Sequence, residues 1–404
     1  MIARIGSRRW VVSLAALTAI TALSIDMSLP AQPTLERAFA VTPEKIQLTL
    51  SLFLVGFALG QLATGYLSDA RGRRTVLIAA LATYTLAGVA CALADGVDML
   101  LVFRFAQGLA AGAAPTIARA MVRDTYDARN AAQVLSTMVA VLAVAPMVAP
   151  LIGGLVLHRL GWRAIFATLA LLGVAFTALA SLTLAETLPV DRRAQLSVRA
   201  IAAGFARFFR TPGTLLPSAI GCATFAGQFA FISDSPFVLI NHFGVAPGRY
   251  GLYFGATALA LMGGATWSSR LLRGGREPHR VLGAGGVALL VGALLVAAGT
   301  QLERFGVIAF IGPMIVYFVG LGLAGPSAVA IAMDPVPQIA GTASSLIGCA
   351  QMISGALSGY VATRVAGADP RKLGMIVATL GSIGAVLALV VSARTRAVRA
   401  ARRL

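Results

Sequence analysis

Repeated apolar runs constrain this chain more than any other feature of its sequence. A helix rises about 1.5 Å per residue and the hydrocarbon core of a bilayer is about 30 Å thick, so a run of about 20 residues can cross it. Of the 404 residues, 58% are hydrophobic and only 12% are charged, which leaves little polar surface for a water-soluble domain. The sequence therefore predicts an all-α membrane protein.

The apolar runs predict twelve transmembrane helices. Their boundaries fall near residues 10–30, 45–66, 75–94, 98–121, 132–157, 162–186, 214–240, 249–270, 281–301, 305–331, 338–363 and 373–393. A polar stretch divides the chain into a six-helix bundle at 1–186, a linker at 187–213 and a second six-helix bundle at 214–404. In the linker, arginines alternate with Ile201, Phe205, Phe208 and Phe209, which predicts an amphipathic helix on the cytoplasmic leaflet.

The basic residues predict the orientation in the membrane. An even number of spans places both termini on one side. That side carries 23 of the 33 Lys and Arg residues, against 9 on the opposite side and Arg104 within a span, so both termini are expected in the cytoplasm. The net charge of +18 is accordingly attributed to topology and contact with anionic lipid, and no nucleic-acid partner is expected. The first run lacks a small-residue cleavage site, which favours a retained span over a signal peptide.

A faint internal repeat relates the two bundles. Gly108-Leu109, Ala118, Ala120 and Met121 recur 212 residues later as Gly320-Leu321, Ala330, Ala332 and Met333. Parallel repeats of six spans are typical of transporters whose binding site lies between the halves. The three Cys and three His residues show no spacing suited to a metal or a disulfide framework, so no metal or cofactor is expected.

Two acids near the predicted outer ends of spans are candidate functional residues. Asp26 lies in the first run, before Pro30, and Asp234 lies in the seventh, before Pro236. An acid within an apolar span is costly, about 2.5–3.5 kcal/mol, and usually functional. The alternatives are that Asp26 caps the helix or reaches the interface, and that Asp234 caps a helix or faces the aqueous rim.

Between the second and third spans, a short connection carries Gly65, Asp69, Gly72, Arg73 and Arg74. Gly72 is expected to supply a turn, and Asp69 to accept hydrogen bonds from arginines or a helix N-terminus. The spacing resembles the loop signature of the major facilitator superfamily, although Ala70 stands where a basic residue is usual. The resemblance implies a loop that latches the cytoplasmic side of the outward-facing state. Arginines alone would fit an ordinary cytoplasmic loop.

Two further stretches resemble signatures of the same superfamily. Arg104-Phe105-Ala106-Gln107-Gly108 is similar to the Arg-x-x-Gln-Gly signature, whose Arg is tied to proton coupling. By depth, Asp26 is the expected ionic partner of Arg104, although Arg104 could serve packing only. The antiporter signature is similar to a stretch of the fifth span, Ala149-Pro150-Leu151-Ile152-Gly153-Gly154, with Ala149 in place of a Gly. Pro146 lies one turn before Pro150. A merely kinked helix would explain the prolines but not their register with the Gly pair.

Local resemblance over most of the chain narrows the family further. The segments concerned are Asp26-Met27-x-Leu29-Pro30, Trp162-Arg163-x-x-Phe166, Ser235-Pro236-Phe237-Val238 and Gly341-Thr342-Ala343-Ser344-Ser345. They resemble bicyclomycin/chloramphenicol-resistance type drug:proton antiporters. This resemblance implies a monomeric, multi-pass protein of the bacterial inner membrane that exports drug-like molecules.

The resemblance also implies which helices line the substrate pathway, namely the first, fourth, seventh and tenth spans. Candidate residues on them are Asp26, Gln107, Phe225, Gln228, Phe231, Asp234 and Tyr317. Apolar walls with a few polar groups suit lipophilic ligands, although helix packing is the alternative role for each residue. We expect Asp26, Arg104 and Asp234 to take part in proton coupling.

The expected function is export of lipophilic drugs in exchange for protons, by alternating access. A proton-coupled metabolite or sugar transporter of the same fold is the alternative. A membrane enzyme is disfavoured, because no His/Asp/Glu cluster suits metal or nucleophilic chemistry. A receptor is disfavoured because no signalling domain is present.

Overall fold

The computed structural model describes residues 4–193, 198–302 and 305–401, and in these residues every regular element is a helix. Two compact units contain them, one of residues 1–197 with 246–251, the other of 198–245 with 252–404. Eleven helical segments of the described chain are long and apolar enough to cross a membrane. The span expected at 249–270 corresponds to α12 (Pro247–Arg273), which is long enough but is not among the eleven.

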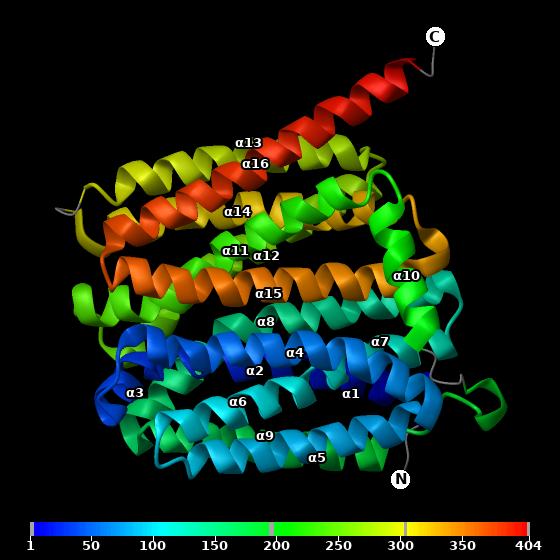
Figure 1. The fold of residues 1–404 in the computed structure, drawn as a ribbon, viewed down its shortest axis with the longest axis horizontal. Coiled ribbons are helices and arrows are strands. Elements are labelled where there is room, and N and C mark those ends of the chain that lie inside the picture. Colours follow the sequence, from blue (N-terminus) through cyan, green and yellow to red (C-terminus); the bar gives the residue numbers. More distant parts are fainter. Residues whose placement is uncertain (1–3, 194–197, 303–304, 402–404) are drawn as a thin grey trace. The chain divides into compact units, whose positions relative to one another are not determined.

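The first unit contains the helices from α1 to α9 (Figure 1). In order these are α1 (Arg8–Thr18), α2 (Ile20–Asp26), the 3-10 turn η1 (Leu29–Ala31), α3 (Gln32–Phe39), α4 (Pro43–Arg71), α5 (Arg73–Ala92), α6 (Val97–Ala111), α7 (Ala113–Thr125), α8 (Ala128–Leu160) and α9 (Trp162–Thr183), followed by a 3-10 turn, η2 (Val190–Arg192). Within it α4 packs against α6, and α5 packs against α9.

The first span departs from the expected boundary. It was predicted to end near Pro30, but the helical run continues to Phe39 and is divided into α1, α2, η1 and α3. Proline lacks an N–H and terminates a helix that precedes it, yet it fits the first turn of a helix that follows. Pro30 and Pro33 occupy such first-turn positions in η1 and α3. Asp26 therefore lies nearer the middle of the helical run than its end.

The second unit contains the helices from α10 onward. They are α10 (Val198–Arg210), α11 (Leu215–Pro236), the π-helical segment η3 (Phe237–His242), α12, α13 (Pro278–Gly299), α14 (Gly306–Met333), the 3-10 turn η5 (Pro337–Ile339), α15 (Ala340–Ala366) and α16 (Pro370–Ala401). Helix α13 packs against both α14 and α16, and α11 packs against α15 (Figure 1).

The helix expected in the linker is α10. One of its aromatic residues does not face a leaflet, because Phe208 is buried in a core cluster with Ala332, Ala343 and Ile347. Phe209 is 57% exposed, and Arg207 donates a hydrogen bond to Gln338. The side chains of Arg199 and Ile201 lie outside the described residues. Helix α10 is thus anchored on the second unit by one side of its surface.

Candidate functional site

A buried arginine is the centre of the polar cluster in the first unit. Arg104 projects from α6 and is 1% exposed. Its Nη1 donates to Gln107 Oε1 at 2.8 Å, its Nη2 to the Ser24 carbonyl at 3.3 Å and its Nε to the Thr49 carbonyl at 3.3 Å. Helices α2, α4 and α6 therefore meet at one guanidinium group.

Aromatic rings complete the surroundings of Arg104. Its guanidinium carbon lies 4.4 Å from the centroid of the Phe53 ring and 5.7 Å from that of Phe166. Ring faces attract a cation, and this attraction is stronger where water is absent. Three oxygen acceptors and two rings thus hold a buried charge without a carboxylate.

The expected ion pair between Asp26 and Arg104 is wrong for this structure. Asp26 is 5% exposed at the C-terminal end of α2, and among the described residues it forms no ion pair. Arg104 reaches α2 through the Ser24 carbonyl, two residues before Asp26 in the chain. The rotation of α2 about its axis, which the sequence does not specify, decides which group meets Arg104.

Ser24 also connects α2 to α5. Its hydroxyl lies 2.6 Å from the Tyr84 hydroxyl, and both side chains are fully buried. The sequence analysis did not single out Tyr84, because a tyrosine in an apolar run is ordinary. Gln107 is also buried, and its Nε2 has no hydrogen-bond partner within the described part of the chain. The cluster therefore retains one unused donor close to Arg104.

The helix with the antiporter-like sequence packs against the segment that holds Asp26. Pro146 and Pro150 both lie inside α8, which continues past them to Leu160. A Cβ atom at Gly153 would collide with the backbone carbonyl of Met27, the residue after Asp26. Gly154 follows on the same helix. The absence of a side chain at Gly153 lets α8 approach the interrupted first span closely.

The predicted loop is a tight connection between α4 and α5. Gly72 has φ of +97°, a conformation that L side chains rarely adopt. Arg73 forms an ion pair with Asp69, a second with Asp124 at 3.0 Å, and a hydrogen bond to the Ser68 hydroxyl at 2.8 Å. Gly65 lies one turn before Asp69 in α4, and a Cβ atom built there would make ordinary contact with the Thr116 side chain at 3.7 Å. Arg73 thus ties α4 and α5 to the end of α7.

Glu186, which follows α9 in the sequence, caps the first turn of α5. Its two carboxylate oxygens accept the backbone N–H groups of Arg73 and Arg74 at 2.9 and 3.1 Å, at the first turn of α5. The Arg74 side chain donates to the carbonyls of Leu184 and Ser181. Sequence analysis missed both Glu186 and Asp124. The available signal was an acid next to the end of a span, which by itself is unremarkable.

In the second unit, Asp234 is fully buried on α11. Neither of its carboxylate oxygens has a hydrogen-bond partner among the described residues. Thr363 on α15 lies close enough to interact with Asp234, and the Thr363 hydroxyl donates to the Gly359 carbonyl at 3.1 Å. A hydroxyl has a single proton to donate, so while Thr363 donates to Gly359 it cannot also donate to Asp234. The burial excludes a place on the aqueous rim.

The aromatic candidates of the second unit are packed among helices. Phe231 is fully buried, with ring centroids 6.0 Å from Phe310 and 5.4 Å from Phe318. Tyr317 is also fully buried, and its ring occupies the space left by Gly227 and Gly381. For these two residues the structure shows helix packing, the alternative role.

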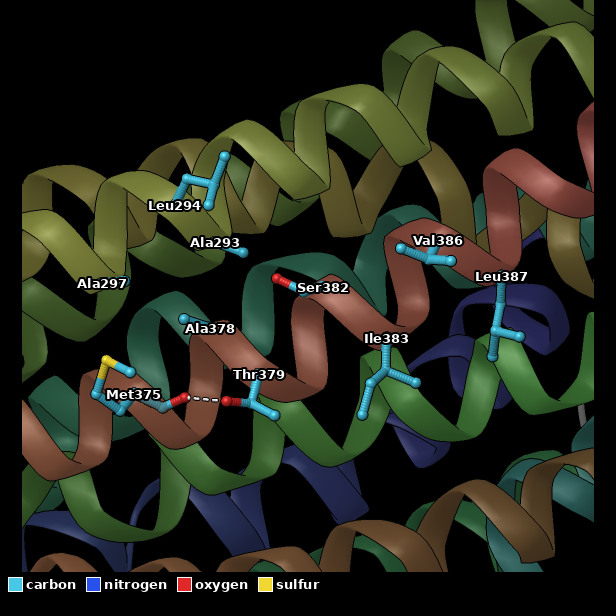
Figure 2. A pocket seen from close by; sticks show the side chains of 10 residues that line it. All are labelled: Ala293, Leu294, Ala297, Met375, Ala378, Thr379, Ser382, Ile383, Val386 and Leu387. Carbon is cyan, nitrogen blue, oxygen red and sulfur yellow. Dashed lines mark hydrogen bonds between the residues drawn. The ribbon is translucent and has the colours of Figure 1, made fainter.

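Phe225 and Gln228 are the more accessible candidates on α11, since both are partly exposed. Phe225 stacks on Phe229 at 4.6 Å. A surface groove of about 540 Å³ lies elsewhere in the same unit, between α13 and α16 (Figure 2). None of the expected pathway residues lines this groove.

Comparisons with known proteins agree on one family. The family model described as "Major Facilitator Superfamily" matches residues 14–359. An uncharacterized MFS-type transporter of Bacillus subtilis is 32% identical over 344 residues, with 83% of each chain covered. A chloramphenicol resistance protein of Pseudomonas aeruginosa is 33% identical over 367 residues, with 87% of this chain and 82% of that protein covered. A bicyclomycin resistance protein homolog of Haemophilus influenzae is 29% identical over 356 residues, with 87% of each covered.

Solved structures share the fold at lower identity. A crystal structure of a D-xylose-proton symporter superimposes with a TM-score of 0.74 at 15% identity and covers 95% of this chain and 97% of that chain. A bacterial homolog of the lysosomal transporter Spinster gives a TM-score of 0.73 at 20% identity and covers 96% and 98%.

Proposed function

Because the chain belongs to the major facilitator superfamily of membrane transporters, we propose that it exports lipophilic drug-like molecules in exchange for protons, by alternating access. The observation that carries the proposal is the match to relatives named for chloramphenicol and bicyclomycin resistance, each of which covers 87% of this chain. The expected substrates are therefore small, largely apolar molecules, and the coupling ion is the proton.

Asp26 is the proposed proton carrier. An acid buried without a counter-ion is stable in its neutral, protonated form, and it ionises when water reaches it. Alternating access would bring Asp26 into contact with water on each side in turn. If substrate and proton compete for the same state of the site, binding of one promotes release of the other.

Arg104 is the proposed modulator of Asp26. It holds the Ser24 carbonyl, so it fixes the turn of α2 that ends in Asp26. Its charge also favours an ionised Asp26 whenever the two approach. In the same proposal, the Asp69–Arg73–Asp124 ion pairs and the Glu186 cap form a latch that stabilises one conformation of the cycle.

The second candidate is a proton-coupled metabolite or sugar transporter. The D-xylose-proton symporter supports this candidate only in fold, because at 15% identity its substrate does not carry over. The direction of proton movement separates the candidates. In inverted vesicles with an acidic interior, an exported compound added outside should dissipate the pH gradient if it exchanges for protons. Symport would leave that gradient intact.

The proposal is tested first by a drug-susceptibility panel in an efflux-deficient host, with chloramphenicol and bicyclomycin included. Compounds that the chain protects against are then assayed in the inverted vesicles. Substrate-dependent collapse of the pH gradient supports drug:proton antiport. Protection without any proton movement would contradict the coupling.

Asp26→Asn should abolish proton-driven export at normal expression, because the amide has no titratable proton. Export and proton movement in inverted vesicles measure the effect. Asp98→Asn is the matched control, since Asp98 is exposed in the first turn of α6 and pairs with Lys45 at 2.6 Å. Export by the Asp26→Asn protein with the pH dependence of the wild type would refute the assignment.

A further inference from the structure

An apolar groove runs along the surface of the second unit between α13 and α16 (Figure 2). Its volume is about 540 Å³. Large side chains on its walls are well exposed: Leu294 is 60%, Met375 50% and Val386 52% exposed. Both helices belong to the segments apolar enough to cross a membrane, so the groove lies at the depth of the lipid chains.

The floor and length of the groove suit a hydrocarbon chain. Thr379 donates its hydroxyl to the Met375 carbonyl at 2.7 Å, so that polar side chain is satisfied within α16 (Figure 2). The lining extends along α16 from Met375 to Leu387, which is about 18 Å at 1.5 Å per residue. One leaflet contributes about 15 Å of the hydrocarbon core. The groove therefore has the length of one leaflet.

A cation stands at the end of the groove nearest the start of α16. Lys372 precedes Met375 by three residues, which places it on the same face of the helix. It is exposed, and it forms no ion pair within the described chain. The Asp369 carboxylate accepts the backbone N–H groups of Arg371 and Lys372, at 2.8 and 3.4 Å, and so serves the helix N-terminus. Arg371, also exposed, adds a second positive charge.

We propose that the groove binds one acyl chain of an anionic phospholipid whose head-group phosphate contacts Lys372. The hydrocarbon lies against the apolar walls, and the phosphate lies about one turn beyond them, at the depth of the head groups. By the predicted topology this site faces the outer leaflet, where Arg371 and Lys372 are exceptions to the bias of basic residues toward the cytoplasm. The site concerns lipid, and it stands whether or not the exported compounds are drugs.

A second copy of the chain is the competing occupant, since Ala293, Ala297 and Ala378 would let a helix approach. Charge argues against it. Two copies in one membrane share the same orientation, so a two-fold contact through this face would bring equivalent residues to the same depth. Lys372 and Arg371 of one copy would then approach those of the other, and like charges repel. A phosphate would instead neutralise Lys372, which forms no ion pair within the described chain.

The test is native mass spectrometry of the purified full chain with phosphatidylglycerol or phosphatidylethanolamine added, together with the melting temperature in the same mixtures. Phosphatidylglycerol should stay bound and raise the melting temperature, and inorganic phosphate should not. Lys372→Glu should weaken phosphatidylglycerol binding at least fivefold, the effect of about one basic residue at a membrane surface. Arg364→Glu is the matched control, an exposed arginine near the end of α15.

Two variants fill the groove, Ala297→Phe and Leu294→Trp, so that one misfolded protein does not decide the result. Both should lose the bound lipid, whereas Leu357→Trp, at a 64% exposed position on α15, should keep it. Equal retention of phosphatidylglycerol by the folded filled variants would overturn the proposal. So would equal binding of the two lipids, or a dimeric mass that only the filled variants lose.

Discussion

Individual buried charges are stabilised in different ways in this molecule. Arg104 has three oxygen acceptors and two aromatic rings, whereas Asp26 and Asp234 form no ion pair within the described chain. The arginine can stay charged because its surroundings replace water. The two acids lack such surroundings, so a buried state favours their neutral forms.

Asp234→Asn should fold as stably as the wild type or more so, because the amide keeps the volume and removes a group that is costly to bury when charged. If Asp234 selects charge, the variant should lose export of a cationic compound and keep export of a neutral one. The melting temperature and parallel export assays measure both effects. Asp334→Asn, at an exposed position after α14, is the control. Equal export of both compounds by the variant would remove Asp234 from the substrate pathway.

The sequence could single out Asp26, Arg104 and Asp234, because a charged residue within an apolar run is costly and therefore conspicuous. It could not tell which groups meet. Contact with Arg104 depends on the rotation of each helix about its axis, and the Ser24 carbonyl, present in any residue, carries no signal in the sequence. The position of Tyr84 opposite Ser24 is equally invisible before the helices are packed.

At the level of helices, close approaches and end caps connect segments that are distant in sequence. Glu186 caps α5 although it is 113 residues away from Arg73 in the sequence. Gly153 on α8 has no side chain, so the backbone of Met27, which follows α2, can pack closely against it. The loop signature predicted the turn at Gly72 and the interaction of Asp69 with an arginine. It could not predict Glu186, because the spacing between a cap and its helix is not fixed when they come from different spans.

Glu186→Ala should lower the free energy of unfolding by about 1 kcal/mol, the usual cost of losing a helix cap, and should slow transport. The Arg73 and Arg74 N–H groups would lose their acceptor. The melting temperature and the export rate measure the change. Asp191→Ala, at an exposed position in η2, should alter neither. An unchanged export rate in Glu186→Ala would show that the cap plays no part in the cycle.

Gly153→Ala should destabilise the protein by about 1–3 kcal/mol and reduce export, because the new methyl group would force α8 away from Met27. Gly312→Ala offers a matched control within α14, where a Cβ atom would meet nothing within 4 Å. Both are measured as melting temperature and export rate. Identical results for the two variants would mean that the contact with Met27 has no role.

The whole molecule follows the hydropathy of its sequence closely, because a bilayer requires every spanning backbone to satisfy its own hydrogen bonds. That requirement explains why the spans were predictable as helices. It does not fix where a span is interrupted, since Pro30 and Pro33 fit equally well after a helix or at the start of the next. The first span was therefore predicted too short.

A reporter fused to the C-terminus, active only in the cytoplasm, should be active in cells, because 23 of the 33 basic residues lie on the side assigned to both termini. The same reporter inserted after Asp369, in the connection before α16, should be silent. A fusion with a reporter active only outside the cytoplasm is the reciprocal measurement. Activity of that second reporter at the C-terminus would contradict the orientation.

The first span is a series of short helical segments and not one uninterrupted α-helix. The interruptions at Ala19 and at Met27–Ser28 lie on either side of the seven residues of α2. Ser24 and Asp26 both lie on α2, and Ser24 forms hydrogen bonds with Arg104 and Tyr84. A change in the orientation of α2 would move both residues together. A movement of Asp26 together with α2 would therefore strain the hydrogen bonds of Ser24 with Arg104 and Tyr84.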